Sequence, residues 1–190
     1  MSVLLYRNRL TKVRIFRKTD LSSPSSSCKE SVMRRKDRAC SDPTFFHDML
    51  DRADVATVAF HAEEYPYVLP LNFVFMDGAL YVHSATEGRK LDCMKKDPRV
   101  GFSVHTVLEI DRDKATTRYE CLCGEGLARI VTDREEKQKA LAALAARFQS
   151  RCEIPVPEHM LEHTAVIRID ILQLSGKRNL PSAAGKTTQS

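Results

Sequence analysis

Two runs of alternating side chains on either side of Asp77-Gly78 constrain the fold of this chain most strongly. In residues 67–74, bulky apolar side chains recur at every second position, which is the period of a β-strand. Residues 79–83 form a second such run, and Asp-Gly between two runs is a strong signal for a two-residue turn. The pattern predicts an antiparallel hairpin. Because Pro70 cannot donate to a strand ladder, its strand is expected to lie at a sheet edge or beside a ligand.

A polar segment with the sequence SATEGRK, residues 84–90, connects this hairpin to a short helix expected over residues 90–96. Amide groups at a helix start carry partial positive charge, and Arg89 and Lys90 add two full charges. Hydroxyl groups, a glycine and two cations at a helix start can together bind an anion. We therefore expect an anion site at this segment.

The rest of the chain adds strands and helices of ordinary length. Four further strands are expected at residues 55–60, 99–106, 116–131 and 164–174, with a bulge or bend at 124–126. Helices are expected at residues 43–52 and 133–148, a charged loop at 108–115, and no regular structure around Pro155 and Pro157. Six antiparallel strands with helices at their corners predict a mainly β fold that closes, fully or in part, as a barrel, because closure removes exposed edges.

The net charge of +5 belongs to the amino-terminal segment. Residues 1–31 hold seven Lys or Arg and two Asp or Glu, whereas the other residues carry 23 of each sign. We expect a disordered basic and Ser-rich extension at 1–31, one domain at 32–178 and a disordered tail at 179–190. A domain without net charge gives no support for nucleic-acid binding. No apolar run approaches the ~20 residues that span a bilayer, so no membrane partner is expected.

Six cysteines without a secretory signal or a disulfide framework favour a reduced, cytoplasmic protein. The Arg-rich composition of residues 1–31 leaves organelle targeting or a misassigned start as alternatives. Cys121 and Cys123 would share one face of a strand, where a metal site can begin. No second pair of Cys or His at ligand spacing accompanies them, so we interpret them as small buried residues and expect no metal.

Several stretches occur in an order that resembles one known family. The sequences PYVLPLNF at 66–73, DGALYVHSATEGRKLD at 77–92 and KKDPRV at 95–100 closely resemble flavin-binding split-barrel proteins related to pyridoxamine 5'-phosphate oxidase. The His-Ser-Ala-x-x-Gly-x-Lys-Leu-Asp pattern at 83–92 resembles the nitroimidazole-resistance branch of that family. The resemblance covers about residues 33–177. Gly124 departs from it, because a large apolar residue is expected there.

The resemblance implies a six-stranded antiparallel split β-barrel that binds flavin mononucleotide (FMN) at the interface of a homodimer. By resemblance, Ser84, Arg89 and Lys90 clamp the phosphate of FMN. The first hairpin strand is implied to lie along the polar edge of the flavin ring through Tyr67, Val68, Leu69, Pro70, Leu71 and Asn72. His83 is implied to lie beside the ribityl chain or the ring, and it is the candidate catalytic residue. With an unperturbed pKa of about 6.5 it can orient a substrate or tune flavin protonation, although a histidine at a strand end is otherwise an ordinary surface residue.

The function implied by this resemblance is FMN-dependent oxidation or reduction of a small molecule, and reduction of a nitroaromatic compound is the leading hypothesis. In that mechanism a reductant delivers hydride to the flavin, and the reduced ring passes electrons to a substrate stacked on its exposed face. Two alternatives stay open. One is a non-enzymatic carrier or sensor of a flavin nucleotide, and the other is the same barrel binding haem or a deazaflavin. Residues for vitamin B6 binding find no counterparts here, so its oxidation is not expected.

Overall fold

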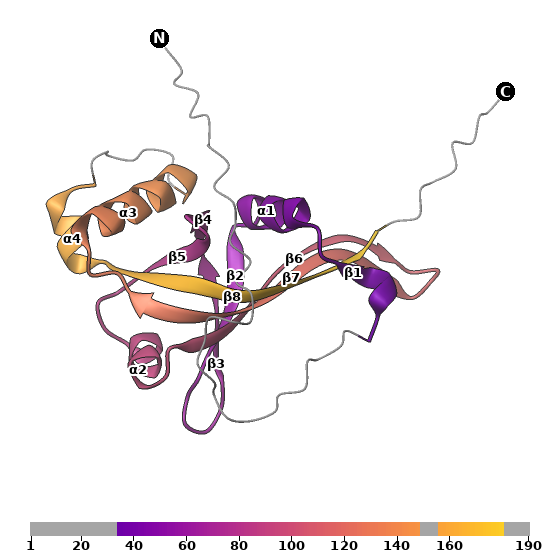
Figure 1. Cartoon of the computed structure of the whole chain (residues 1–190), viewed down its shortest axis with the longest axis horizontal. Helices are drawn as coiled ribbons and strands as arrows, with labels where there is room; N and C mark the ends of the chain where they lie inside the picture. Colours follow the sequence, from indigo (N-terminus) through magenta and orange to yellow (C-terminus); the bar gives the residue numbers. More distant parts are fainter. Residues whose placement is uncertain (1–33, 149–155, 181–190) are drawn as a thin grey trace, which may run out of the picture.

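The computed structural model describes residues 34–148 and 156–180 of the chain, and strands dominate these residues (Figure 1). The elements follow one another as η1 (Lys36–Arg38), β1 (Ala39–Cys40), α1 (Pro43–Arg52), β2 (Val55–Phe60), β3 (Tyr67–Asn72), β4 (Val74–Met76), β5 (Ala79–Ser84), α2 (Arg89–Lys96), β6 (Arg99–Asp111), β7 (Thr116–Ile130), α3 (Arg134–Phe148), α4 (Glu158–His163) and β8 (Ala165–Asn179). The three longer predicted helices are confirmed as α1, α2 and α3, with bounds within one or two residues of those expected.

The eight strands of the described residues form one antiparallel sheet in the order β3-β2-β6-β7-β8-β5-β4, with β1 paired to the end of β8. The outermost strands, β3 and β4, are consecutive in the sequence, and only Phe73 separates them. The sheet must therefore curl until its two edges approach each other, and Phe73 is fully buried at the junction. This curled sheet confirms the predicted split barrel. The six expected strands correspond to β2, β3, β5, β6, β7 and β8, and the short β1 and β4 were not predicted.

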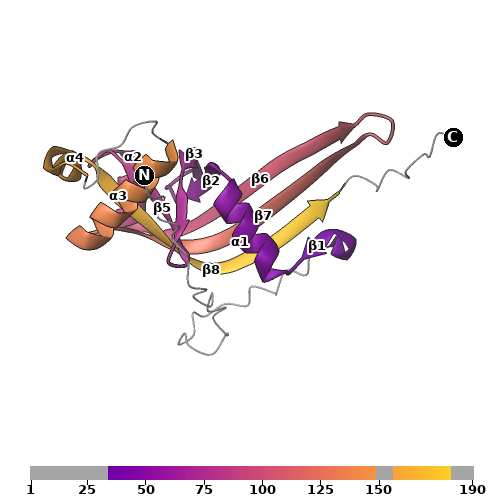
Figure 2. The same cartoon turned by 90° about the horizontal axis from the view of Figure 1, so that it is seen from above.

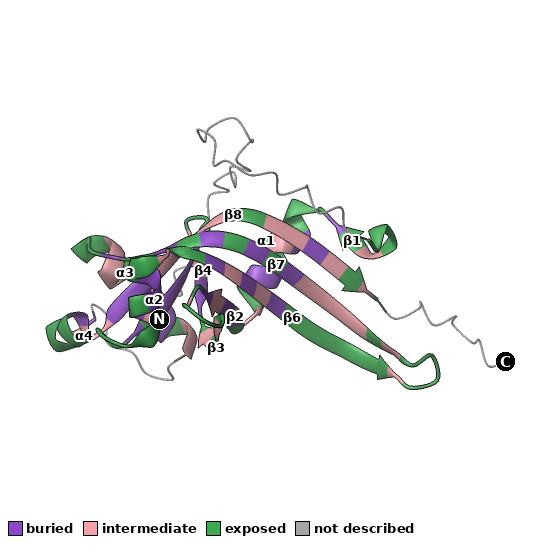
Figure 3. Ribbon diagram, turned by 90° about the horizontal axis from the view of Figure 1, so that it is seen from below, coloured by how far each residue is buried: buried purple, intermediate pink, exposed green. Residues whose placement is uncertain are grey.

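The curled sheet separates two apolar cores. Alternate residues of the strands point to the inside of the barrel, where α1 and α2 add their apolar faces. On the outside, α3 and α4 cover one end of the sheet and form a second core with β4, β5 and β8. Figure 3 shows the resulting alternation of buried and exposed bands along β7, whereas the outer half of β6 is continuously exposed. Adjacent residues of β5 consequently belong to different cores, Val82 to the inner one and Tyr81 to the outer one.

The predicted hairpin is confirmed, although its first strand is shorter than expected. β4 and β5 pair antiparallel around a two-residue turn in which Asp77 and Gly78 have φ angles of 52° and 75°. Two positive φ angles give the backbone the twist that a tight antiparallel hairpin needs. The run expected as one strand over 67–74 is divided at Phe73, so that β3 pairs with β2 and β4 pairs with β5. β3 is an edge strand, which is one of the two arrangements expected from Pro70.

A large aromatic ring explains the unexpected glycine in β7. Gly124 is the register partner of Phe102 on β6, and a Cβ atom at Gly124 would overlap the Phe102 ring. The Phe102 ring on β6 therefore fills the space that a large side chain at position 124 would occupy. The predicted irregularity is confirmed as a register shift between Glu125 and Gly126 in the pairing with β8, which has Leu172 as its extra residue.

Three expectations about irregular segments are wrong. Residues 108–111 continue β6, so that the expected charged loop is reduced to residues 112–115 because cross-strand pairing reaches Asp111. β8 continues to Asn179 instead of ending at residue 174, since β7 pairs with it along this length. α4 begins directly after Pro157, a position that proline tolerates at a helix start. Figure 2 shows β6 and β7 extending away from the barrel as a long arm.

The expected terminal extensions fall largely outside the described residues, which exclude 1–33, 149–155 and 181–190. Asn179, placed by the sequence in the tail, is the last residue of β8. Among the residues that the structure describes, no helix combines the length and apolar character that crossing a membrane would require.

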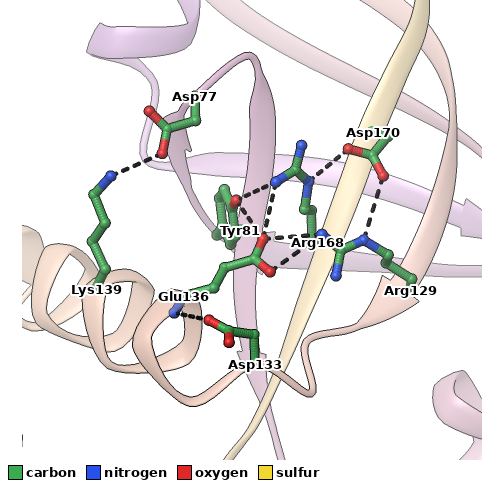
Figure 4. A network of polar contacts seen from close by, with 8 residues as sticks. All are labelled: Asp77, Tyr81, Arg129, Asp133, Glu136, Lys139, Arg168 and Asp170. Atoms are coloured by element: carbon green, nitrogen blue, oxygen red, sulfur yellow. Dashed lines mark hydrogen bonds and ion pairs between the residues drawn. The ribbon is translucent and has the colours of Figure 1, made fainter.

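A polar network fastens the first turn of α3 to the outer face of the sheet (Figure 4). The Glu136 carboxylate accepts hydrogen bonds from Tyr81 Oη at 2.8 Å and from Arg168 Nη1 at 2.9 Å. Arg129 Nη2 donates a third at 3.0 Å, and Asp170 accepts from Arg168 Nε at 2.6 Å. Burial opposes the charge on Glu136, but these hydrogen bonds outweigh it and lower the pKa of its carboxyl. Burial and the bond to Glu136 raise the pKa of Tyr81 to about 12.

The lowered pKa of Glu136 predicts a pH-dependent contribution to stability. A carboxyl whose pKa is lower in the folded state stabilises the fold above its unfolded pKa, and this contribution is lost as the pH falls through the folded pKa. Glu136→Gln should therefore reduce the free energy of unfolding by about 2 kcal/mol at neutral pH. The difference from the wild type should shrink in acid. Denaturant unfolding at several pH values measures both effects. Glu135→Gln is the matched control, and a pH-independent difference for Glu136→Gln would contradict the prediction.

Candidate functional site

A buried hydroxyl group without a partner marks the end of β5. Ser84 is 5% exposed and is the one buried polar residue in the described part of the chain. Its Oγ has no hydrogen-bond partner. Ser84 shares the barrel-facing side of β5 with Leu80 and Val82, both members of the inner core. An unsatisfied buried hydroxyl costs about 1–3 kcal/mol, so this position favours a ligand that can accept or donate a hydrogen bond.

The start of α2 lies four residues beyond Ser84 and offers further donors. Gly88 is the N-cap residue and has a φ of 126°, a conformation that side chains disfavour. Among the described residues, no side chain caps this helix start, although the Leu91 amide donates to the Gly88 carbonyl at 2.9 Å. The amides of Arg89 and Lys90 precede this bond, and such first amides of an α-helix have no partner within the helix and carry partial positive charge. The geometry of Gly88 therefore begins a helix whose amino end remains available to an anion.

Two cations stand at this helix start without a compensating acid. Among the described residues, no carboxylate lies within ion-pair distance of Arg89 or Lys90. The Arg89 guanidinium lies over the Tyr67 ring, 4.6 Å from its centroid. This cation–π contact joins the start of α2 to the start of β3. Ser84, the amino end of α2, Arg89 and Lys90 are hereafter called the cradle.

β3 forms one wall beside the cradle. Its Tyr67, Leu69 and Leu71 side chains pack against the inner core, whereas Val68, Pro70 and Asn72 are exposed. Because β3 pairs only with β2, its second edge leaves backbone donors and acceptors unpaired. A flat ligand can bind along such an edge through backbone hydrogen bonds. The predicted strand residues are thus placed next to the predicted anion-binding residues, through the contact between Tyr67 and Arg89.

His83 does not join the cradle within one chain. It is exposed and precedes Ser84, so its side chain points to the opposite face of β5. Its register partner on β8 is Val166, a member of the outer core, whereas the partner of Ser84 is Ala165 of the inner core. The structure therefore brings Ser84, Arg89 and Tyr67 to one side of β5 and places the predicted catalytic residue on the other.

A cavity of about 300 Å³ lies along α2, where it shares Arg89 with the cradle but not Ser84 or Lys90, and the sequence reasoning did not anticipate it. One wall is the face of α2 that begins at Arg89 and includes Cys93 and Lys96; the other is the loop between β2 and β3, including Tyr65. Lys96 Nζ donates a hydrogen bond to Glu63 at 2.6 Å across the rim. A larger hollow of about 370 Å³ beside α1 involves none of the predicted site residues. The contact of Arg89 with Tyr67 also had no signal in the sequence, because it depends on how the sheet curls.

The arrangement fits a phosphate group. A phosphate needs several hydrogen-bond donors and positive charge in one place. The cradle supplies the unsatisfied hydroxyl of Ser84, the uncapped amides of α2 and the cations of Arg89 and Lys90. The buried hydroxyl of Ser84 reduces the stability of an isolated chain because it has no partner among the described residues, whereas the exposed Arg89 is solvated. The unsatisfied hydroxyl is therefore explained better by a ligand than by folding.

Comparisons with known proteins agree with the architecture. A candidate 5-nitroimidazole antibiotic resistance protein from Bacteroides thetaiotaomicron is 23% identical with a TM-score of 0.63, and the alignment covers 73% of this chain and 85% of that one. An FAD-binding protein from Mesorhizobium loti is 21% identical with a TM-score of 0.58, covering 75% and 97%. An FAD- and haem-binding protein from Mycobacterium smegmatis is 20% identical with a TM-score of 0.63, covering 77% of each chain.

These structural likenesses establish the fold. A search of curated proteins found no significant match. The sequence profile described as pyridoxamine 5'-phosphate oxidase matches residues 42–178, a span that includes β3, β5, α2 and the whole cradle. The chain therefore belongs to the pyridoxamine 5'-phosphate oxidase family.

Proposed function

We propose that this protein binds FMN in the cradle and uses it to oxidise or reduce a small molecule. The observation that carries the proposal is the buried, unpartnered hydroxyl of Ser84 next to two uncompensated cations. Family membership and the flavin-binding structural relatives support a flavin. FMN is preferred as the cofactor because residues 66–100 resemble the FMN-binding split-barrel proteins, for which Ser84, Arg89 and Lys90 are implied to bind one phosphate.

Different residues of this chain would bind the phosphate and the ring of FMN. Ser84 and the first amides of α2 would donate hydrogen bonds to the phosphate, and Arg89 and Lys90 would neutralise its charge. The free edge of β3 would offer backbone groups to the polar edge of the ring, and its half-buried Leu69 and Leu71 would exclude water from one side. When bound, FMN supplies a ring that accepts and donates hydride, so no protein nucleophile is needed.

A nitroaromatic compound is the substrate class we propose. The proposal is supported by the His-Ser-Ala-x-x-Gly-x-Lys-Leu-Asp pattern at 83–92 and by the fold shared with the Bacteroides thetaiotaomicron protein. His83, exposed on the opposite face of β5, would act on a cofactor held by a second copy rather than by its own chain. Its role in this proposal is to orient the substrate or to tune protonation at the flavin.

A second copy would also cover apolar surface on the arm. Val107 is 54% exposed, and Ile110 is 62% exposed near the tip of β6. Exposed apolar side chains that project from the body of a domain are typical of an interaction surface. We propose that two chains associate through this arm as a homodimer and bring the flavin site to their interface.

The dimer proposal predicts the mass of the protein in solution. Light scattering should give twice the mass of one chain. Replacing Val107 and Ile110 together by Asp should shift the mass toward that of one chain, because the charges would have to be buried in the interface. Lys114→Asp, on the exposed turn of the same arm, is the control. A wild-type protein with the mass of one chain at micromolar concentration would contradict the proposal.

Ser84→Ala should have opposite effects on the stability of the cofactor-free protein and on its affinity for FMN. Removing an unsatisfied hydroxyl should raise the free energy of unfolding of the cofactor-free protein by about 1 kcal/mol. The same change should weaken FMN binding about tenfold, since one hydrogen bond to a charged group is lost. Denaturant unfolding and quenching of flavin fluorescence measure the two effects. Ser103→Ala on β6 is the control, and a cofactor-free Ser84→Ala protein that is less stable than the wild type would overturn this role.

Removing both cations should weaken FMN retention strongly. Charge-assisted hydrogen bonds are worth about 1.5–3 kcal/mol each, so Arg89→Ala with Lys90→Ala should lower FMN affinity by about 100-fold or more. Lys95→Ala with Lys114→Ala removes the same net charge elsewhere and should leave FMN affinity nearly unchanged. Affinity is measured by fluorescence titration. An equal effect of the two pairs would show that only overall charge matters, which would exclude the cradle.

The visible spectrum and a turnover assay discriminate between this function and the alternatives. The purified protein should show flavin bands, whereas a Soret band would indicate the haem alternative and a blue-shifted spectrum a deazaflavin. With a nicotinamide reductant and a nitroimidazole, the enzyme should consume both substrates under anaerobic conditions. A protein that shows flavin bands but consumes neither would be a carrier or sensor of the nucleotide.

A further inference from the structure

Cys121 and Cys123 share one face of β7, as the sequence predicted, but they are more exposed than expected. Leu122, between them, is fully buried in the inner core, so the two cysteines point to the outer face of β7. Cys121 is partly exposed and Cys123 is exposed, which corrects the expectation that both are small buried residues. Two thiols on an open sheet face contribute little to packing. Their position is therefore not explained by the core.

The separation of the two sulfur atoms matches a metal chelate. Cys121 Sγ and Cys123 Sγ are 3.8 Å apart. Two thiolates bound to one tetrahedral zinc ion at about 2.3 Å each lie about 3.8 Å from each other. The pair could therefore bind such an ion without any movement of the backbone. A disulfide would require the sulfur atoms to approach to about 2.05 Å, and it would also require an oxidant.

A histidine lies next to this pair across the sheet. His105 on β6 is the register partner of Cys121, and directly opposed residues of an antiparallel pair share one face. Its side chain is exposed and has room to change rotamer. In the described residues, no three His, Cys, Asp or Glu side chains are already close enough to hold a metal. A three-ligand site would need the His105 side chain to rotate toward the two sulfur atoms.

We propose that Cys121, Cys123 and His105 form a site for a thiophilic divalent cation of the zinc class. The two thiolates act as a preformed chelate, His105 supplies a nitrogen ligand, and the fourth tetrahedral position is open to water or to another ligand. Two sulfur ligands and one nitrogen ligand with an open position form a known zinc-ligand set. This site lies on the outer face of β6 and β7, whereas Ser84 of the cradle faces the barrel interior. Val107 of the proposed dimer contact lies two residues from His105 on β6, and the zinc site itself requires no bound flavin.

Calorimetry with Zn²⁺ on the full-length, reduced and chelator-treated protein tests this site. The wild type should bind one Zn²⁺ ion tightly per chain. Binding should release protons, because each cysteine thiol loses its proton when it binds the metal as a thiolate. X-ray absorption at the zinc edge should show two sulfur ligands and at least one nitrogen ligand. Cys121→Ser or Cys123→Ser should weaken binding by about 100-fold or more, because the chelate is lost. His105→Ala should weaken it by about tenfold and remove the imidazole signal from the spectrum.

Cysteines elsewhere in the fold provide the matched controls. Cys40→Ser and Cys93→Ser alter buried thiols away from this face and should leave Zn²⁺ affinity unchanged. Circular dichroism confirms that each variant is folded, and the exposed His105→Ala provides a test that does not disturb packing. Absence of a tight equivalent in the wild type would overturn the proposal. Unchanged affinity in Cys121→Ser and Cys123→Ser would overturn it as well, whatever the outcome of flavin titrations.

Discussion

The junction between β3 and β4 imposes the shape on which the rest of this structure depends. These strands form opposite edges of the sheet, yet one residue, Phe73, connects them. A flat sheet would separate its edges by the width of all the strands between them, so the sheet must curl. The curl places Phe73 in the inner core and brings the free edge of β3 near the end of β5 and the start of α2. The contact between Tyr67 and Arg89 is a consequence of this closure.

Two polar clusters of this structure differ in how their groups are paired. Around Glu136, every charged group has partners on neighbouring strands, and the network secures α3 against the outer face. At the cradle, among the described residues, a buried hydroxyl has no hydrogen-bond partner and two cations have no acidic partner. The first arrangement stabilises the fold, whereas the second carries a cost of unsatisfied polarity that a bound phosphate would remove. This contrast is the physical basis for assigning a structural role to one cluster and a binding role to the other.

Short sequence patterns were enough to predict much of this structure. The Asp77-Gly78 turn, the three longer helices and the edge position of β3 follow from short sequence patterns, and the resemblance of residues 83–92 indicated the cradle. What could not be predicted depends on pairing between distant strands. The match of Gly124 with Phe102 and the position of His105 beside Cys121 require the register of β6 against β7. The face of His83 was predictable, because adjacent strand residues point in opposite directions and Ser84 was already expected at the phosphate.

Phosphate recognition by the cradle underlies the proposed function, and a comparison of the affinities for FMN and riboflavin tests it most directly. The two ligands share the ring and the ribityl chain and differ only in the phosphate. Titration of the cofactor-free protein with each should show FMN binding tighter by about 100-fold or more, as expected for at least two charge-assisted hydrogen bonds. Equal affinity for FMN and riboflavin would contradict the account, because Ser84, Arg89 and Lys90 would then take no part in binding.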